Sequence, residues 1–213
     1  MNRYKNLFFP LLKRRIKYEG KGDGKRSTYS DYHDEIQEDC QHRCVYCDIT
    51  VQEHGYEGMQ LDHFRPEIRF PRLQNDPNNL VLACPKCNRL KWHNWPCEID
   101  ENKPSYSGDV GFIDPFGEDR WSFFSVDEDG KLVPIQHPAT YIMNLLNLNR
   151  KARVQVRRKR IFISRIQALM QDHDVNIKKA IESFSKGDLT LDDVDQEIEQ
   201  GKKLYALLSV IIS

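Results

Sequence analysis

The sequence predicts an α+β protein in which a small, cysteine-stapled core lies between a helical N-terminal lead and a mainly helical C-terminal region. Three observations predict this class. Two CxxC pairs bracket residues 48–83, turn-forming residues punctuate the segment after them, and apolar residues recur at helical spacing from about Pro138 onward. The expected segments are therefore the lead, the cysteine module, a turn-rich segment with a hairpin and the helical region, at residues 1–39, 40–97, 98–135 and 136–213.

The lead and the turn-rich segment each carry one expected element. The lead begins with basic and aromatic residues, continues through a glycine-rich loop at 20–24, and is expected to form a helix from about Tyr29 to Asp39. In the turn-rich segment, residues 123–126 and 131–133 have the composition of two short strands, and Asp127–Gly130 has that of a turn. We therefore expect a hairpin there.

The C-terminal region shows helical periodicity. Val156, Ile163, Ile166 and Met170 follow one another at spacings that place them on one helix face. A shorter helix is expected at residues 177–184, followed by a break at Lys186-Gly187-Asp188. Leu191–Leu208 then predict a last helix, with Gly201 on its apolar face.

Charge is balanced overall but uneven along the chain. The 213 residues carry 32 basic and 32 acidic side chains, which argues against a uniformly basic nucleic-acid binder. From Ala139 to Met170, however, there are eight basic residues and no acidic one. This stretch is either a solvated helix face or a surface for the DNA backbone, and on the second interpretation we expect nucleic-acid contacts from Arg150, Arg153 and Arg157.

Cellular location decides how the six cysteines are interpreted. No apolar run approaches the roughly 20 residues of a membrane span, and the N-terminus lacks a small-residue cleavage site. We therefore expect a cytoplasmic protein with no membrane partner. In a reducing compartment cysteines more often hold metal than form disulfides.

The two CxxC pairs predict a structural zinc site. Each CxxC turn brings two thiolates within reach of one ion, and two such turns complete a tetrahedral set, here Cys44, Cys47, Cys84 and Cys87. Cys40 or His42 is an alternative ligand, but the simpler interpretation leaves Cys40 and Cys97 outside the site.

The segment between the pairs carries residues suited to phosphodiester cleavage. That reaction needs a base that activates water and a cation that neutralises charge developing on the phosphate. His63 suits the base, because neutral imidazole accepts a proton near neutral pH. Asp62 and Asn88 offer the oxygen ligands that Mg²⁺ or Mn²⁺ prefers.

The order of motifs, CxxC, DHxxP, NL and CxxCNxxK, resembles the HNH family of nucleases. The resemblance implies a metal fold of two strands and one helix, with His63 as the general base, Asp62 and Asn88 as ligands of the catalytic ion, and Asn79 as a support of the active-site loop. Lys91, one turn after Asn88, would contact phosphate. Beyond these residues, Ile113-Asp114-Pro115 and Leu146–Asn149 resemble standalone HNH nucleases of Septu and retron type. Those are paired with ATPases in bacterial anti-phage systems, so an ATPase partner is implied.

The sequence leaves several alternatives open. Adjacent residues of a regular strand face opposite ways, so Asp62 and His63 share a site only if the strand ends or bends there. His93 is a rival metal ligand to Asn88. Trp92 and Trp95 are expected to pack under the zinc module rather than to stack on bases. The competing function is a non-catalytic zinc module that binds nucleic acid or protein.

Overall fold

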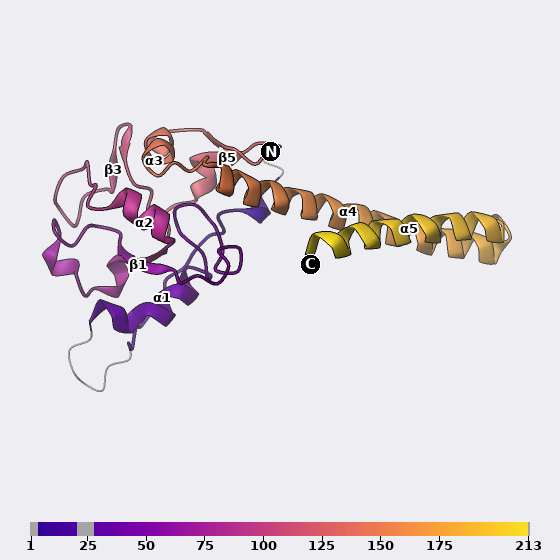
Figure 1. Ribbon diagram of the computed structural model, residues 1–213, viewed down its shortest axis with the longest axis horizontal. Helices are drawn as coiled ribbons and strands as arrows, with labels where there is room; N and C mark the ends of the chain where they lie inside the picture. Colours follow the sequence, from indigo (N-terminus) through magenta and orange to yellow (C-terminus); the bar gives the residue numbers. More distant parts are fainter. Residues whose placement is uncertain (1–3, 21–27, 213) are drawn as a thin grey trace. The chain divides into compact units, whose positions relative to one another are not determined.

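The computed structural model describes residues 4–20 and 28–212 as a mixture of helices and small antiparallel sheets, which confirms the predicted fold class (Figure 1). The expected glycine-rich loop lies outside the described residues from residue 21 onward. The α-helices and strands are α1 (His33–Asp39), β1 (Gln60–His63), β2 (Leu80–Ala83), α2 (Pro85–Lys91), β3 (Tyr106–Ser107), β4 (Val110–Gly111), β5 (Phe124–Val126), β6 (Leu132–Pro134), α3 (Ala139–Leu145), α4 (Lys151–Lys186) and α5 (Leu191–Ile212).

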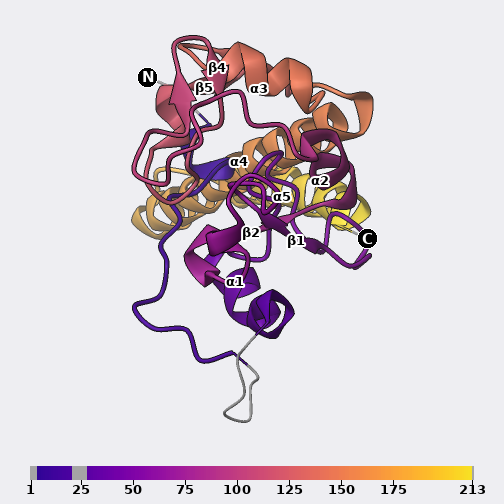
Figure 2. The ribbon, with the colours of Figure 1, turned by 90° about the vertical axis from the view of Figure 1, so that its left-hand side faces the viewer.

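The chain forms two compact units, Met1–Val156 and Arg157–Ser213. At the centre of the first unit β1 and β2 pair antiparallel, with Gln60 opposite Ala83 and His63 opposite Leu80 (Figure 2). Every residue of β2 is buried, which explains its uninterrupted apolar sequence. Helix α2 follows β2 after a single residue and begins at Pro85, whose missing N–H costs nothing in the first turn. The result is a β–β–α unit.

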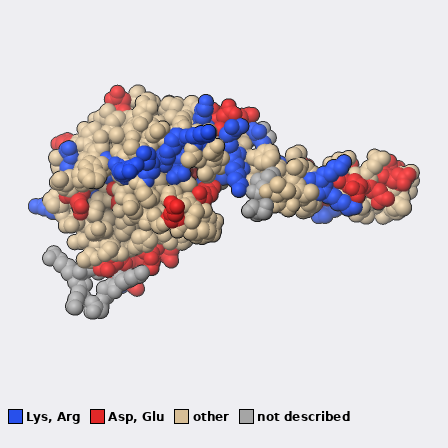
Figure 3. Space-filling view, in the orientation of Figure 1, with Lys and Arg blue, Asp and Glu red and all other residues tan. Residues whose placement is uncertain are grey.

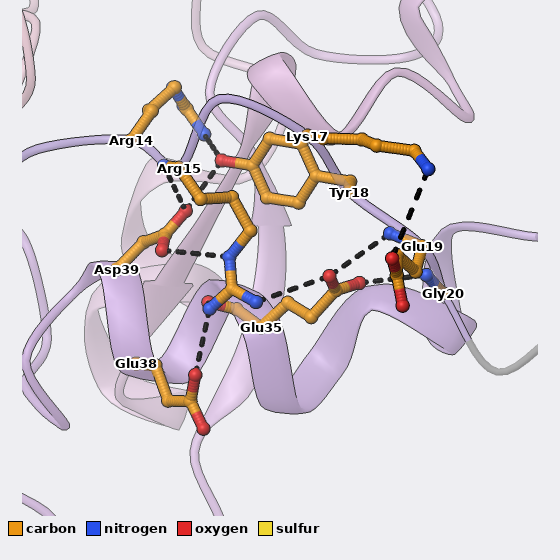
Figure 4. A network of polar contacts seen from close by, with 9 residues as sticks. All are labelled: Arg14, Arg15, Lys17, Tyr18, Glu19, Gly20, Glu35, Glu38 and Asp39. Atoms are coloured by element: carbon orange, nitrogen blue, oxygen red, sulfur yellow. Dashed lines mark hydrogen bonds and ion pairs between the residues drawn. The ribbon is translucent and has the colours of Figure 1, made fainter.

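The N-terminal lead is held against α1 by a polar network (Figure 4). Arg15 donates hydrogen bonds to the carboxylates of Glu35, Glu38 and Asp39 at 3.1, 2.8 and 3.0 Å. Burial raises the pKa of Tyr18 to about 12, and its hydroxyl donates to Asp39 at 2.6 Å. The expected helix near Tyr29–Asp39 is confirmed, as a 3-10 turn over Tyr29–Tyr32 that continues into α1.

The turn-rich segment contains the expected hairpin and a second one. β5 pairs antiparallel with β6, which confirms the prediction. The unexpected hairpin pairs β3 with β4, strands too short to leave a periodic pattern. Its Gly111 has φ +122°, and a Cβ there would lie 2.4 Å from the Cα of Tyr106, so only glycine fits. On the face of this unit in Figure 3, Lys and Arg side chains gather in a band and Asp and Glu side chains gather at the lower edge.

The second unit is a pair of antiparallel helices (Figure 1). The expected separate helix at 177–184 is wrong, because α4 is continuous to Lys186. No glycine or proline interrupts the sequence between Met170 and Lys186. The break at Gly187 is confirmed, with φ +82°. Gly201 lies where the two helices approach closely, since a Cβ would meet His173 Nε2 at 2.2 Å. Within the described residues, no helix has both the length and the apolarity that crossing a membrane requires.

Candidate active site and metal centre

Four thiols meet beside the β–β–α unit. Cys44 and Cys47 lie in the loop before β1, and Cys84 and Cys87 lie at the start of α2. All four are buried and their sulfur atoms lie within 4.8 Å of one another. A tetrahedral ion with Zn–S bonds of about 2.3 Å places its sulfurs about 3.8 Å apart. The 3.7 Å between the sulfurs of Cys47 and Cys84 fits that geometry, so the cluster suits zinc.

The other two cysteines do not belong to the cluster. Cys40 accepts a hydrogen bond from the Leu82 N–H at 3.3 Å, and burial raises the pKa of its thiol to about 11. Cys97 donates to the carbonyl of Ser105 at 3.4 Å. His42 is exposed. Within the described residues, only the CxxC cysteines form a group of this kind.

Two arginines cover the sulfur cluster. An Arg150 nitrogen lies 3.5 to 3.7 Å from the sulfurs of Cys87, Cys47 and Cys84, and Arg153 Nε donates to Cys47 at 3.3 Å. Burial alone would lower the pKa of the Arg150 guanidinium, but the negative charges of Cys87 and Cys47 raise it on balance. The same causes raise the pKa of Arg153.

Burial corrects the expected DNA contacts of Arg153 and Arg157, whereas the expected contact of Arg150, which is partly exposed, stays a prediction. Arg153 is 8% exposed and Arg157 is 2% exposed, so neither presents its charge to a phosphate backbone. Arg150 is directed to the thiols. The physical reason is that thiolates held together need cations nearby, and the sequence does not indicate which face of a basic helix is covered.

Of the predicted site residues, Asp62, His63 and Asn88 line one pocket of about 320 Å³ at the end of β1, and Asn79 does not. Because β1 ends at His63, the alternation of strand side chains does not separate Asp62 from its neighbour. Asn88 enters from α2. The remaining lining residues are Tyr29, Gln60, Leu61, Pro66, Glu67, Arg89, Trp92 and His93.

His63 is held with a defined tautomer. Its Nε2 lies 2.8 Å from the carbonyl oxygen of Gln74. A carbonyl only accepts hydrogen bonds, so Nε2 carries the proton and Nδ1 carries the lone pair. The Tyr29 ring packs edge-on against the imidazole at 5.1 Å, and a Glu67 carboxylate oxygen lies 3.8 Å from Nε2. The imidazole is therefore fixed in the form that a general base requires.

Asp62 is 7% exposed and its carboxylate has two partners inside the protein. The ammonium of Lys91 lies 3.1 and 3.0 Å from its two oxygens, and the Tyr46 hydroxyl donates to it at 2.5 Å. Burial, together with the Asp62 charge, raises the pKa of Tyr46 well above its usual value of 10, which keeps the hydroxyl a neutral donor. Tyr46 lies between Cys44 and Cys47, so the first cysteine turn contacts the Asp62 carboxylate directly.

Lys91 differs from its expected role. It is 0% exposed, is absent from the lining of the pocket that Asn88 lines, and also donates to the carbonyl of His63 at 2.8 Å. A buried ammonium with these partners does not reach a phosphate, so the predicted nucleic-acid contact at this position is wrong. Arg89, on the same helix, is exposed on the pocket wall instead.

The two asparagines occupy different places. Asn88 donates from its amide nitrogen to Gln60 Oε1 at 2.9 Å, which leaves its amide oxygen as an acceptor. Asn79 is 5% exposed and lies away from the pocket lining. Its amide donates to the carbonyl of Arg65 and accepts from the Arg65 N–H, both at 2.9 Å. Asn79 thus fixes the chain directly after the Asp62-His63 strand.

Sequence reasoning missed several residues of the site. Tyr46 could have been noticed from its place inside a CxxC turn, and Arg89 from its place beside Asn88; Tyr29 and Gln60 leave no signal of this kind. His93 lines the same pocket as its rival Asn88. Trp95 packs as expected at 3% exposed, whereas the same expectation is wrong for Trp92, which is 68% exposed.

Comparison with known proteins agrees with the geometry. Residues 44–94 match the HNH endonuclease family, which confirms the resemblance inferred from the motifs. The Septu protein PtuB of Bacillus thuringiensis is 35% identical over 49 residues. These residues make up 23% of this chain and 19% of PtuB, so the likeness covers about a fifth of that relative's length.

Proposed function

We propose that this chain is a divalent-metal-dependent endonuclease that hydrolyses phosphodiester bonds in DNA. The observation that carries the proposal is the convergence of Asp62, His63 and Asn88 on one pocket, within the segment that matches the HNH endonucleases. The four cysteines hold a structural Zn²⁺ and keep the two halves of the module together.

The donor set fits a hard divalent cation. Asp62 and Asn88 offer one carboxylate and one amide oxygen beside a pocket with room for water, and Mg²⁺ commonly keeps several waters beside one or two protein ligands. A carboxylate has about four lone-pair sites, so Lys91 and Tyr46 do not exhaust Asp62. When bound, Mg²⁺ or Mn²⁺ supplies charge stabilisation at the phosphate and at the leaving 3′ oxygen, which gives 5′-phosphate ends.

The side chains of the pocket divide the remaining work. His63 takes a proton from the attacking water at Nδ1, because Nε2 is already committed to the Gln74 carbonyl. Asn79 positions the loop that follows, and Arg89 replaces Lys91 as the cation for the substrate phosphate. Tyr46 holds the Asp62 carboxylate in place from the zinc side.

A wider role follows from the resemblance to standalone HNH nucleases. We propose an anti-phage defence effector that works in the cytoplasm with an ATPase subunit. The likeness to PtuB supports this role over the matched residues only. A partner that controls access to DNA would also supply sequence specificity, since no base-reading element is evident in the part of the chain that the structure describes.

The test is cleavage of plasmid and linear DNA by the purified chain with Mg²⁺ or Mn²⁺, alone and with the ATPase. We expect metal-dependent cleavage that the His63→Ala variant lacks, with its zinc content and circular dichroism unchanged. The competing function is a non-catalytic zinc module, which is favoured by one observation: Lys91 already neutralises the buried charge of Asp62. That function predicts no metal-dependent cleavage under any of these conditions.

A further inference from the structure

An exposed indole, that of Trp92, lines the pocket of the candidate active site. Trp92 is 68% exposed and lines the same pocket as Asp62 and His63. The chain has three tryptophans, and the other two, Trp95 and Trp121, are 3% and 8% exposed. Large aromatic side chains normally bury much of their area, so an exposed indole on the lining of a pocket is a candidate contact for a ligand.

The backbone of Trp92 adopts a strained conformation. Helix α2 ends at Lys91, and Trp92 follows with φ +48°, a region that bulky residues rarely adopt. Its N–H still bonds to the carbonyl of Asn88 at 2.9 Å, so the helix end fixes the residue relative to a predicted metal ligand. The indole has one ring neighbour, His93, at 4.6 Å.

Chemistry around the indole points to a nucleotide. Arg89 is exposed on the same wall, and the Tyr29 ring, 40% exposed, lies against His63. Cationic side chains that follow a phosphate backbone and aromatic faces that stack on bases together make a binding site for unpaired strands. In a duplex the faces of the bases are covered by their neighbours, whereas in a single strand they are open.

Resting on the proposed nuclease function, we propose that Trp92 stacks on an unpaired base next to the scissile phosphate, so that the substrate is single-stranded DNA or a single-stranded stretch within a duplex. The pocket then receives the phosphate at His63 while the indole holds the adjoining base. This assigns a substrate class to the site.

Tryptophan fluorescence tests the proposal without requiring cleavage. The full chain carrying His63→Ala is titrated with a short oligothymidylate, and with the same strand annealed to its complement. Because the other two indoles are buried, quenching reports on Trp92. We expect quenching by the single strand only. Dye-labelled oligothymidylate should bind the Trp92→Ala variant roughly 5- to 150-fold more weakly, and Trp92→Phe, which keeps a ring, should lose less.

A matched control is available in Tyr56, an aromatic residue with φ +58° that is 73% exposed and lies outside the pocket lining. Tyr56→Ala should leave binding unchanged. Equal quenching by duplex and single strand, or equal affinity of the Trp92→Ala and Tyr56→Ala variants, would overturn the proposal. A chain that binds single strands through Trp92 but never cleaves them would remove the nuclease function and leave only the stacking of Trp92 on an unpaired base. Cleavage that is unchanged in the Trp92→Ala variant would keep the nuclease function and remove the assignment of Trp92.

Discussion

The two candidate metal positions of this molecule are built in opposite ways. The sulfur site is closed: four buried thiols face one another, and arginines cover them. The proposed oxygen site is open: Asp62, His63 and Asn88 are among the residues that line a pocket of about 320 Å³. Closed tetrahedral sites contribute folding energy, whereas sites with free positions do chemistry. We therefore propose that an ion in the sulfur site holds the module together, while an ion in the oxygen site would keep positions open for a substrate.

The largest expected effect is on folding, and it comes from removing one cysteine ligand of the sulfur site. Replacing Cys87 by serine should abolish zinc binding and unfold the module, since zinc contributes on the order of 10 kcal/mol or more to folds of this kind. Zinc content and circular dichroism measure the outcome. Cys97→Ser, which lies outside the cluster, should keep both. If Cys87→Ser and Cys97→Ser had the same zinc content and circular dichroism, the cysteine cluster would not be what stabilises the module.

The next effect concerns the buried pair at the open site. Asp62→Asn should destabilise the fold by about 3–5 kcal/mol, because it leaves the fully buried ammonium of Lys91 without its partner. Denaturant unfolding measures this change. Adding Lys91→Met should restore most of the lost stability without restoring cleavage. A double variant no more stable than Asp62→Asn would contradict the pairing.

The arginine cover sharpens the comparison further. Zinc with four thiolates carries a net charge of −2, and Arg150 and Arg153 donate to those sulfurs. Changing both to glutamine should weaken zinc retention by about 10- to 100-fold, as for other groups that support metal ligands. Competition with a chelator measures the affinity. Arg158→Gln, an exposed position on the same helix, serves as control, and equal zinc loss there would indicate a mere effect of net charge.

The smallest expected effect tests whether the sulfur site influences the metal requirement of the oxygen site. Tyr46→Phe removes only the hydroxyl that joins the cysteine turn to Asp62. We expect normal zinc content and a cleavage rate about tenfold lower, with more Mn²⁺ needed for half-maximal activity. The matched change is Tyr106→Phe, whose hydroxyl contacts Glu118 outside the pocket. An unchanged Mn²⁺ requirement would mean that the sites are independent.

The sequence predicted the closed site more completely than the open one. Two CxxC turns leave little freedom in how their thiols meet, so cysteine spacing alone indicated the cluster. The motif order also indicated that Asp62, His63 and Asn88 share a site, and the pocket brings them together. Their roles as base and ligands stay predictions.

What could not be predicted depends on burial, which residue type and spacing do not determine. Lys91 has the right helical position for the site, but its burial reverses its expected role. Arg153 and Arg157 were expected to contact DNA because the sequence does not indicate that these two side chains are buried. Trp92 and Trp95 are three residues apart, yet one is exposed and the other is core.

The convergence of three side chains on a second, oxygen-lined metal position is tested most directly by crystals of the chain soaked in Mn²⁺. Anomalous scattering should locate one manganese ion bound by Asp62 and Asn88, with the imidazole of His63 facing the same cavity. A manganese ion elsewhere, or none in the pocket while zinc fills the cysteine cluster, would contradict the account.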